Sequence, residues 1–415
     1  MDAKYRYTKA ACYMVNITMA VVGNLPPLLF LTFHNLYGIS YSLLGFFVLV
    51  GFVTQLVVDL IFSFFSHRFN IPKTVKFTPI LAVVGFAIFM LSPVLFPNNI
   101  YAGLLLGVFI FSASSGLAEV LISPVIAAIP ADDPESEMSK LHSIYAWGAV
   151  FVIIVSTLFI LLFGSNNWQW LTGLFLLVPI SAAYLYARSE IPPMKTPDRV
   201  SGTLKYIKNK SLWLCIVAIF LGGAAECTMA QWASCYLEQA LGISKIWGDV
   251  FGVALFSFTL ALGRTMYSKY GKNIGRVLFI GALGSTLCYL IAAITNINAI
   301  GLFACGFTGF CVSMFWPGSL IVAADRFPTG GVFIYAMMAA GGDLGASVGP
   351  QLIGVITDAA MGSQRLVSFA QRLAIMPEQL GMKIGMLAGM CFSLVAIPVY
   401  LHIYRKQKGD ADNAQ

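Results

Sequence analysis

Apolar segments of membrane-spanning length follow one another along almost the whole chain, separated by short polar stretches. A run of about 20 apolar residues crosses the hydrocarbon core of a bilayer as a helix. Backbone groups in lipid must pair within the segment, and the alternation typical of a membrane barrel is absent. The pattern predicts an all-α membrane protein with twelve transmembrane helices. We expect them at residues 10–34, 41–66, 75–95, 99–130, 139–163, 168–188, 211–241, 246–270, 274–294, 299–326, 331–357 and 382–404.

The longest polar connection inside this pattern lies after the sixth predicted helix, at residues 189–210. It is basic and rich in proline. The loops after the second and eighth helices, SHRFNIPKTV and SKYGKNIGRV, are weakly similar, as expected of parallel six-helix repeats. The sequence therefore predicts two pseudo-symmetric six-helix halves. We place them at residues 1–188 and 211–405, with 189–210 as a cytoplasmic linker and 406–415 as a cytoplasmic tail.

Composition and charge agree with a membrane protein and set its orientation. Hydrophobic residues make up 58% of the chain and charged residues 10%, which excludes a water-soluble domain. If the N-terminus lies inside, all but four of the 25 Lys and Arg residues fall on the inner side, as the positive-inside rule requires. The four exceptions are Lys245, Arg365, Arg372 and Lys383. We expect a multi-pass inner (plasma) membrane protein with both termini in the cytoplasm.

Two further segments and the net charge complete this picture. The first apolar segment is too long for a signal-peptide core, so we expect it to be retained as a helix. The outer connection 358–381 is long enough for a short surface helix. The net charge of +7 comes from residues in short loops rather than from one basic face, so we expect no nucleic-acid partner. We expect a monomer in a lipid membrane.

Acidic residues inside the predicted helices are the first candidates for chemistry. Charged groups in hydrocarbon are costly, so they usually face a cavity or a partner and have a role. No Lys or Arg lies near the middle of any predicted helix, and desolvation disfavours a charged carboxylate, so such groups can bind and release protons. The candidates for proton coupling are Glu119, Glu226, Asp343 and Asp59.

Each of these acids also has a simpler interpretation. Glu119 and Glu226 fall near the midplane, but a protonated Glu can also serve packing through a hydrogen bond to a neighbouring helix. Asp343, in AAGGDLGASVGP, could bind a proton or cation, or cap a local break in its helix. Asp59 lies nearer the inner end of its helix, where it could pair with a cytoplasmic charge as part of a gate.

Polar and aromatic residues near the midplane are the candidates for solute binding. Side-chain amides and carboxylates bind sugar hydroxyls, and an aromatic ring packs under the apolar face of a sugar. The alternative role for Trp and Tyr is packing or anchoring at the interface. The candidates are Asn24, Asn16, Gln55, Gln231, Trp232, Tyr236 and Trp316.

Other kinds of site are not indicated. The eight cysteines all lie within predicted helices without a C-x-x-C spacing, so we expect neither disulfides nor zinc. The four histidines have no metal-site spacing, and there is no phosphate-binding loop. No nucleophile–base pair is apparent. We therefore expect no cofactor, no metal and no enzymatic activity.

The basic loops contain the residues that suggest a family. At SFFSHRFNIPK (63–73) and GRTMYSKYGKNIGR the chain resembles the major facilitator superfamily, whose signature between helices two and three has the form G-x-x-x-D-R-x-G-R-R. Arg68 fits, whereas His67 and Asn70 replace the Asp and Gly. The second copy fits better. The resemblance implies a gate on the cytoplasmic side, with Arg68, Arg264 and Arg276 as its basic residues.

The seventh predicted helix is similar to the sugar–proton symporter branch that includes the fucose permease. That branch often has Glu, Trp and Tyr-Leu at the spacing of Glu226, Trp232 and Tyr236 here, and a Glu in helix four, as Glu119. It also has an acidic residue in helix one, where this chain has Asn24. The resemblance implies proton-coupled sugar transport and a cavity lined by helices one, four, seven and ten.

We therefore expect a secondary active transporter that works by alternating access, as a proton-coupled symporter of a neutral polar solute such as a sugar. Its partners are the small-molecule solute and the proton, with sodium as the alternative coupling ion. The alternative function is proton-coupled export of organic cations or drugs, because buried acids without cations also suit a positive ligand. The lack of buried Lys or Arg argues against anions, unless an Arg from a helix end reaches in.

Overall fold

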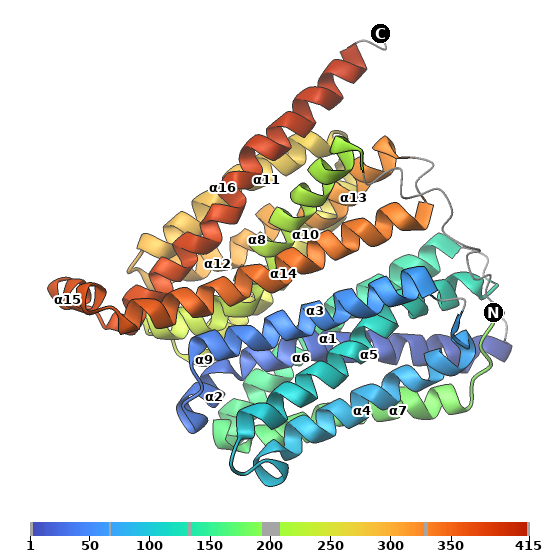
Figure 1. The fold of residues 1–415 in the computed structure, drawn as a ribbon, viewed down its shortest axis with the longest axis horizontal. Coiled ribbons are helices and arrows are strands. Elements are labelled where there is room, and N and C mark those ends of the chain that lie inside the picture. Colours follow the sequence, from blue (N-terminus) through green and yellow to red (C-terminus); the bar gives the residue numbers. More distant parts are fainter. Residues whose placement is uncertain (1–2, 66–67, 131–133, 193–207, 328–330, 413–415) are drawn as a thin grey trace. The chain divides into compact units, whose positions relative to one another are not determined.

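The computed structural model describes residues 3–65, 68–130, 134–192, 208–327 and 331–412, and all regular structure in these ranges is helical (Figure 1). The chain forms two compact units. Unit 1 comprises residues 1–39 and 50–200, and unit 2 comprises residues 40–49 and 201–415. The first part of the helix that begins at Tyr41 thus groups with unit 2, and its remainder with unit 1.

The helices up to residue 187 follow the predicted ones closely. They are α1 (Arg6–Leu28), α2 (Phe30–Tyr37), α3 (Tyr41–Phe65), α4 (Ile71–Leu95), α5 (Ile100–Ala128), α6 (Pro134–Phe163) and α7 (Trp168–Ala187), with single 3-10 turns at Ala3–Tyr5 and Ser165–Asn167. The predicted helix 10–34 is divided at Leu29. Pro26 and Pro27 lie just before this division, and neither can donate to the carbonyl four residues earlier, which weakens the helix there.

The remaining helices lie in unit 2. They are α8 (Lys210–Leu241), α9 (Lys245–Gly248), a π-helical turn (Asp249–Ala254), α10 (Leu255–Tyr270), α11 (Ile274–Ile294), α12 (Asn298–Val312), α13 (Phe315–Arg326), α14 (Gly331–Gly362), α15 (Gln364–Arg372) and α16 (Pro377–Asp412). The helix α15 lies within the connection 358–381, which was expected to be long enough for a short surface helix. The predicted helix 299–326 is divided between α12 and α13.

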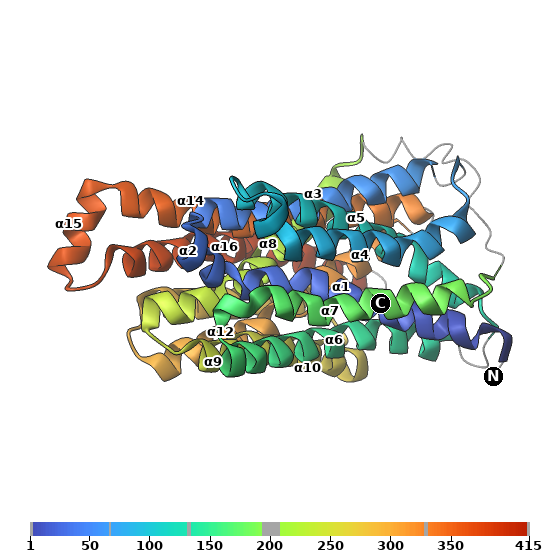
Figure 2. The ribbon, with the colours of Figure 1, turned by 90° about the horizontal axis from the view of Figure 1, so that it is seen from below.

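Close packing within each unit depends on small residues. In unit 1, α4 and α5 lie side by side, and in unit 2, α11 lies beside α16 and α8 beside α14 (Figures 1 and 2). Gly345 of α14 lies against the backbone of α8 at Phe220, where there is no room for a Cβ. Such contacts let two helix backbones approach closely, which is how membrane helices associate.

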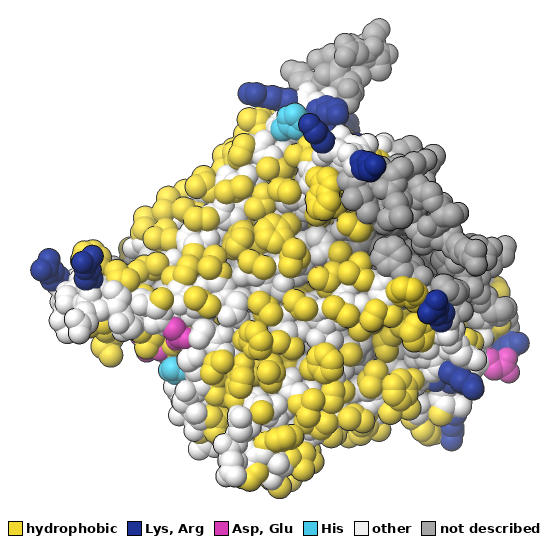
Figure 3. All heavy atoms as spheres, in the orientation of Figure 1, with side chains coloured by type: hydrophobic (Ala, Val, Ile, Leu, Met, Phe, Trp, Pro, Cys, Tyr) yellow, Lys and Arg dark blue, Asp and Glu magenta, His cyan; other side chains and the backbone are white. Residues whose placement is uncertain are grey.

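The surface of the helices is apolar, as expected of a membrane protein. Large hydrophobic side chains such as Val94, Trp170 and Phe303 are more than 60% exposed. On the face drawn in Figure 3, hydrophobic side chains cover the flanks of the helices, and Lys and Arg gather at helix ends. A water-soluble protein rarely exposes so much contiguous apolar surface.

Ten helical segments among the described residues are long and apolar enough to cross a membrane. The helices α6 and α14, at the fifth and eleventh predicted positions, are not among those ten. The multi-pass membrane character is therefore confirmed, whereas the count of twelve crossings stays a prediction. The bounds of the two halves also stay a prediction, and residues 193–207 of the expected linker lie outside the described residues.

Candidate functional site

Two carboxylates meet on α3 and α5 in unit 1. A Cβ placed on Gly51 would lie 3.3 Å from Oγ of Ser112, and one placed on Gly116 would lie 3.0 Å from Cα of Gln55. Asp59 follows Gln55 by one turn of α3, and Glu119 follows Gly116 by about one turn of α5, so this packing places Asp59 beside Glu119. Consistent with this register, the two carboxylates are close enough to interact electrostatically.

These two carboxylates have no cationic partner among the described residues. Asp59 is 7% exposed, and its Oδ1 atom has no hydrogen-bond partner. Glu119 is exposed, and neither carboxylate forms an ion pair with any residue that the structure describes. Two negative charges in one low-dielectric site repel each other, so such a pair is stabilised when one of them binds a proton or another cation.

In unit 2 a different arrangement surrounds Glu226, halfway along α8. Nη2 of Arg264 in α10 donates to Oε1 of Glu226 at 3.1 Å and to Oε2 at 3.4 Å. The expectation that Glu226 lacks a cation is therefore wrong. The long Arg side chain reaches from α10 to α8, and the two residues are 38 positions apart in the sequence. Hydrophobic patterning does not predict which residues of two different helices come into contact.

The position of Arg264 depends on a break between α12 and α13. Pro317 has no N–H, so it cannot donate to the carbonyl of Ser313 four residues earlier. The helix is interrupted there, and Nε of Arg264 donates to the free carbonyl of Ser313 at 3.0 Å. The same side chain is 42% exposed, although its Nε and Nη2 atoms are bonded.

Two more candidates lie next to this ion pair. Asp343 of α14 is 4% exposed, and Cys227 is close enough to interact electrostatically with Asp343, Glu226 and Arg264. The ring of Trp316 packs on Gly342 and Gly223. The candidates Glu226, Asp343, Trp316 and Arg264 are thus gathered around one stretch of α8.

The predicted solute-binding residues of unit 1 bond to backbone carbonyls. Nδ2 of Asn16 donates to the carbonyl of Leu141, Asn24 donates to Ala20 at 2.8 Å, and Gln55 donates to Gly51 at 3.4 Å. Asn16 is buried, whereas Asn24 and Gln55 are half-buried. Their role in solute binding stays a prediction.

On α8 the predicted residues differ in exposure. Trp232 is fully buried and donates through Nε1 to the carbonyl of Pro350 at 2.9 Å. Tyr236 is also fully buried, and its hydroxyl donates to the carbonyl of Ala292. Gln231 is half-buried. The polar atoms of the two aromatic residues form hydrogen bonds with backbone carbonyls of unit 2. The solute-binding role of all three residues stays a prediction.

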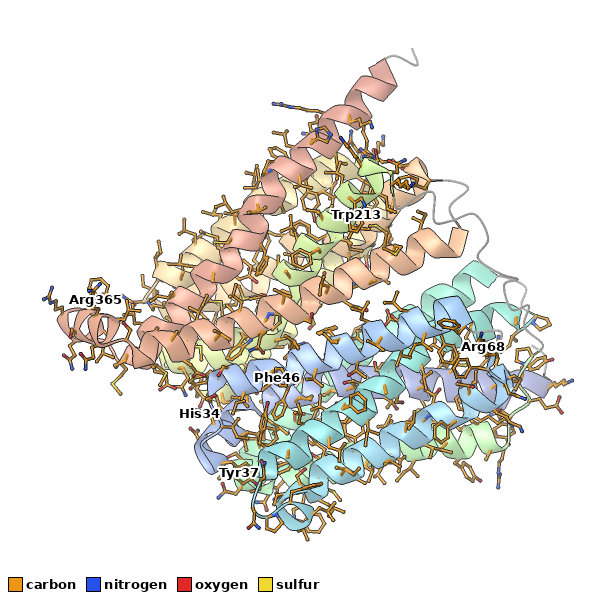
Figure 4. All side chains as sticks on the ribbon, viewed as in Figure 1. His34, Tyr37, Phe46, Arg68, Trp213 and Arg365 are labelled. Carbon is orange, nitrogen blue, oxygen red and sulfur yellow. The ribbon has the colours of Figure 1, made fainter. Side chains whose placement is uncertain are left out.

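The three predicted gating arginines lie in different settings. Arg68 is exposed at the end of unit 1 opposite His34 and Tyr37, with its guanidinium 5.4 Å from the Phe65 ring centroid (Figure 4). Arg276 is exposed near the start of α11, whereas Arg264 is bonded to Glu226. His67 of the first signature lies outside the described residues. The gating role stays a prediction.

A buried ion pair that follows the C-terminal end of α8 was not predicted from the sequence. Lys245 forms an ion pair with the fully buried Asp249 at 3.1 Å, and Ser234 donates to the same carboxylate. The four-residue spacing of Lys245 and Asp249 was a usable signal. In unit 2, Asp358 of α14 accepts the backbone N–H groups of Tyr41 and Ser42 at 3.2 and 2.7 Å, which caps the start of α3.

Similarity to known proteins agrees with this architecture. Residues 11–350 match the family model described as the Major Facilitator Superfamily. No curated protein sequence matches the chain. Several solved structures of low sequence identity share its fold.

Three of these structures illustrate the likeness. A bacterial homolog of the human lysosomal transporter Spinster has a TM-score of 0.71 and 14% identity, covering 98% of both chains. A D-xylose–proton symporter has a TM-score of 0.73 and 14% identity, covering 96% of this chain and 97% of the other. The E. coli fucose:proton symporter has a TM-score of 0.58 and 14% identity, covering 95% of this chain and 99% of the other.

Proposed function

The chain belongs to the major facilitator superfamily, and we propose that it is a secondary active transporter that symports a proton with a small polar solute of the sugar class. Members of this superfamily are membrane transporters rather than enzymes. We further propose that it resides in the plasma membrane with both termini in the cytoplasm, as the distribution of Lys and Arg supports.

The observation that carries proton coupling is the Asp59–Glu119 pair of unit 1. Both residues lie within helices of membrane-spanning length, and neither has a cationic partner among the described residues. A carboxylate in such a place is unfavourable when charged. One proton bound by the pair removes the repulsion and most of the desolvation cost, and losing it restores both.

Proton binding can then bias an alternating-access cycle. The protonated pair is readily desolvated, whereas the doubly charged pair requires water. A state that exposes the pair to water is therefore favoured without the proton, and a state that encloses it is favoured with the proton. Transporters of this plan couple ions to solutes by moving their repeats around a central site.

The sugar class of the solute has weaker support. Glu226 and Arg264 offer an acceptor and a donor near the middle of α8, and the ring of Trp316 packs on Gly223, one turn before Glu226 on the same helix. Amide, carboxylate and guanidinium groups with an aromatic ring are the usual partners of sugar hydroxyls. Two structures of the same fold are described as symporters of D-xylose and of fucose with protons.

Proton flux in proteoliposomes tests this proposal. The purified protein is reconstituted with a pH-sensitive dye in the lumen, and a panel of neutral sugars, polyols and sugar acids is added outside. We expect lumen acidification with at least one of these solutes. Asp59→Asn and Glu119→Gln should each abolish the acidification, because the remaining carboxylate then has no charged neighbour to drive proton binding.

A matched control and two contrary outcomes complete the test. Glu190→Gln removes an exposed carboxylate that pairs with Lys4 at the surface of unit 1, and should behave like the unmodified protein. Full solute-driven acidification in both the Asp59 and Glu119 variants would contradict proton coupling at this pair. Exchange of protons for an organic cation such as tetraphenylphosphonium, without response to any sugar, would support export instead.

A further inference from the structure

The guanidinium of Arg264 is only partly used by its partners. Its Nε is bonded to Ser313, and its Nη2 is shared between both oxygens of Glu226. Among the described residues, no partner is found for Nη1. The contact therefore differs from the two-nitrogen fork in which Arg binds a carboxylate most strongly.

Exposure of this group is also unusual for an ion pair so far along two apolar helices. The Arg264 side chain is 42% exposed and that of Glu226 is 16% exposed. An ion pair that served only to bury two charges would be expected to satisfy its donors and to exclude water. This pair instead leaves two N–H donors open on an anchored guanidinium.

From these contacts we propose that Arg264 binds the carboxylate of a sugar acid, such as a uronate, and that this carboxylate displaces Glu226. The inference rests on the function proposed above and replaces the neutral solute expected from the sequence. The solute carboxylate would take the Nη1–Nη2 edge as a fork, while the bond from Nε to Ser313 holds the guanidinium in place.

Displacement leaves Glu226 next to other groups that disfavour its charge. Among the described residues, the Cys227 thiol on α8 and the Tyr400 hydroxyl on α16 interact electrostatically with Glu226, and Arg264 is its cation. Asp343 on α14 interacts with the same Cys227. Once Arg264 binds the solute, Glu226 loses its cation and lies next to the carboxylate of the solute, so it takes up one proton. The site gains one negative charge from the solute and one positive charge from the proton, and its net charge is unchanged.

The first experiment compares thermal unfolding of the detergent-purified full chain with D-glucuronate and with D-glucose, because a ligand that binds only the folded state raises Tm. We expect a rise with D-glucuronate and a much smaller one with D-glucose. Arg264→Gln should lower the affinity for D-glucuronate by about tenfold or more, the cost of losing charge-assisted hydrogen bonds. Lys269→Gln, which removes another exposed cation from the same helix, is the matched control.

Two further variants separate solute binding from folding. Arg264→Lys keeps the charge but not the fork, so its affinity should fall between those of the native protein and Arg264→Gln. Glu226→Gln leaves Arg264 available, so it should bind D-glucuronate at least as well as the native protein. It should also abolish the uptake of one proton per bound solute, measured with an indicator dye in weakly buffered solution.

Several results would overturn the inference. They are equal Tm shifts with D-glucose and D-glucuronate, an Arg264→Gln variant of native Tm that binds D-glucuronate normally, and loss of D-glucuronate binding in Glu226→Gln. The outcomes for Asp59 and Glu119 variants are independent of these. Suppose that Glu226→Gln abolishes the proton uptake that accompanies solute binding, while the Asp59 and Glu119 variants keep native proton flux. This combination would refute proton coupling at the unit 1 pair and would still support the proposed site at Arg264.

Discussion

At the scale of single residues, Trp232 gives a clear prediction, because the sequence resemblance implies a solute-binding role whereas the side chain is buried. It is fully buried, donates to Pro350, and its ring centroid lies 6.2 Å from that of Tyr41. Trp232→Phe keeps most of the apolar volume but leaves the Pro350 carbonyl without its donor. We expect a loss of about 1 kcal/mol of stability, seen as a Tm lower by a few degrees, with unchanged solute affinity.

The control for this change is Trp213→Phe, because Trp213 is 48% exposed and the same substitution there changes a side chain at the surface. Its Tm should stay close to that of the native protein. If Trp232→Phe lowered solute affinity tenfold without changing Tm, Trp232 would be a binding residue, as the sequence resemblance implied.

The sequence identifies single residues well only where they contrast with their surroundings. Asp59, Glu119 and Glu226 stand out because each is charged within an apolar run. Their partners are a property of tertiary structure, and for this reason neither the Asp59–Glu119 register nor the Glu226–Arg264 pair could be predicted. Pro317 carried a local signal of a helix break, but the use of the released carbonyl by Arg264 depends on how α10 packs.

At the scale of helices, most boundaries were predictable because polar residues end the apolar runs. Asn70, Asn99, Asn209 and Asn273 each accept a backbone N–H at the start of a helix, as expected of N-caps. The divisions within long apolar runs were missed at Leu29 and at Ser313. Hydropathy does not predict these two divisions, since the residues on both sides of each division are equally apolar.

The break between α12 and α13 gives a prediction about a single helix. Pro317→Ala supplies the missing N–H, which can then donate to the carbonyl of Ser313 and compete with Nε of Arg264. We expect the new amide of residue 317 to be protected from hydrogen exchange. The other amides in peptides covering residues 310–320 should exchange no faster than in the native protein. The affinity for D-glucuronate should fall, because the guanidinium loses the contact that holds it.

Pro398→Ala in α16 is a suitable comparison, because it also restores an N–H within a long helix, at an exposed position of that helix. Protection should increase there without loss of affinity. Unchanged affinity in Pro317→Ala, with the new amide protected, would show that the Ser313 contact is dispensable for holding Arg264.

At the scale of the whole molecule, two kinds of information agree on a multi-pass protein without fixing the number of crossings. Ten helical segments satisfy the length and hydropathy expected of a membrane span. The distribution of Lys and Arg is asymmetric only if α6 also crosses, because without that crossing the 14 basic residues of the later inner segments move outside. Without α14, three basic residues on each side exchange places and the totals stay the same, so the count does not test that crossing. The charge pattern therefore adds a constraint that the apolarity of individual helices does not supply.

Reporter fusions test that constraint directly. With twelve crossings, a green fluorescent protein fused after Gln415 folds in the cytoplasm and fluoresces, and alkaline phosphatase fused after Arg372 is exported and active. Fusions of the fluorescent protein after Lys272 and Arg326 should fluoresce, since the positive-inside rule predicts that both residues lie on the inner side. If α14 did not cross, the reporters after Arg372 and Arg326 would report the same side. If α6 did not cross, every fusion after residue 163 would report the opposite side, and beyond that residue the inner side would carry four Lys and Arg residues instead of 14.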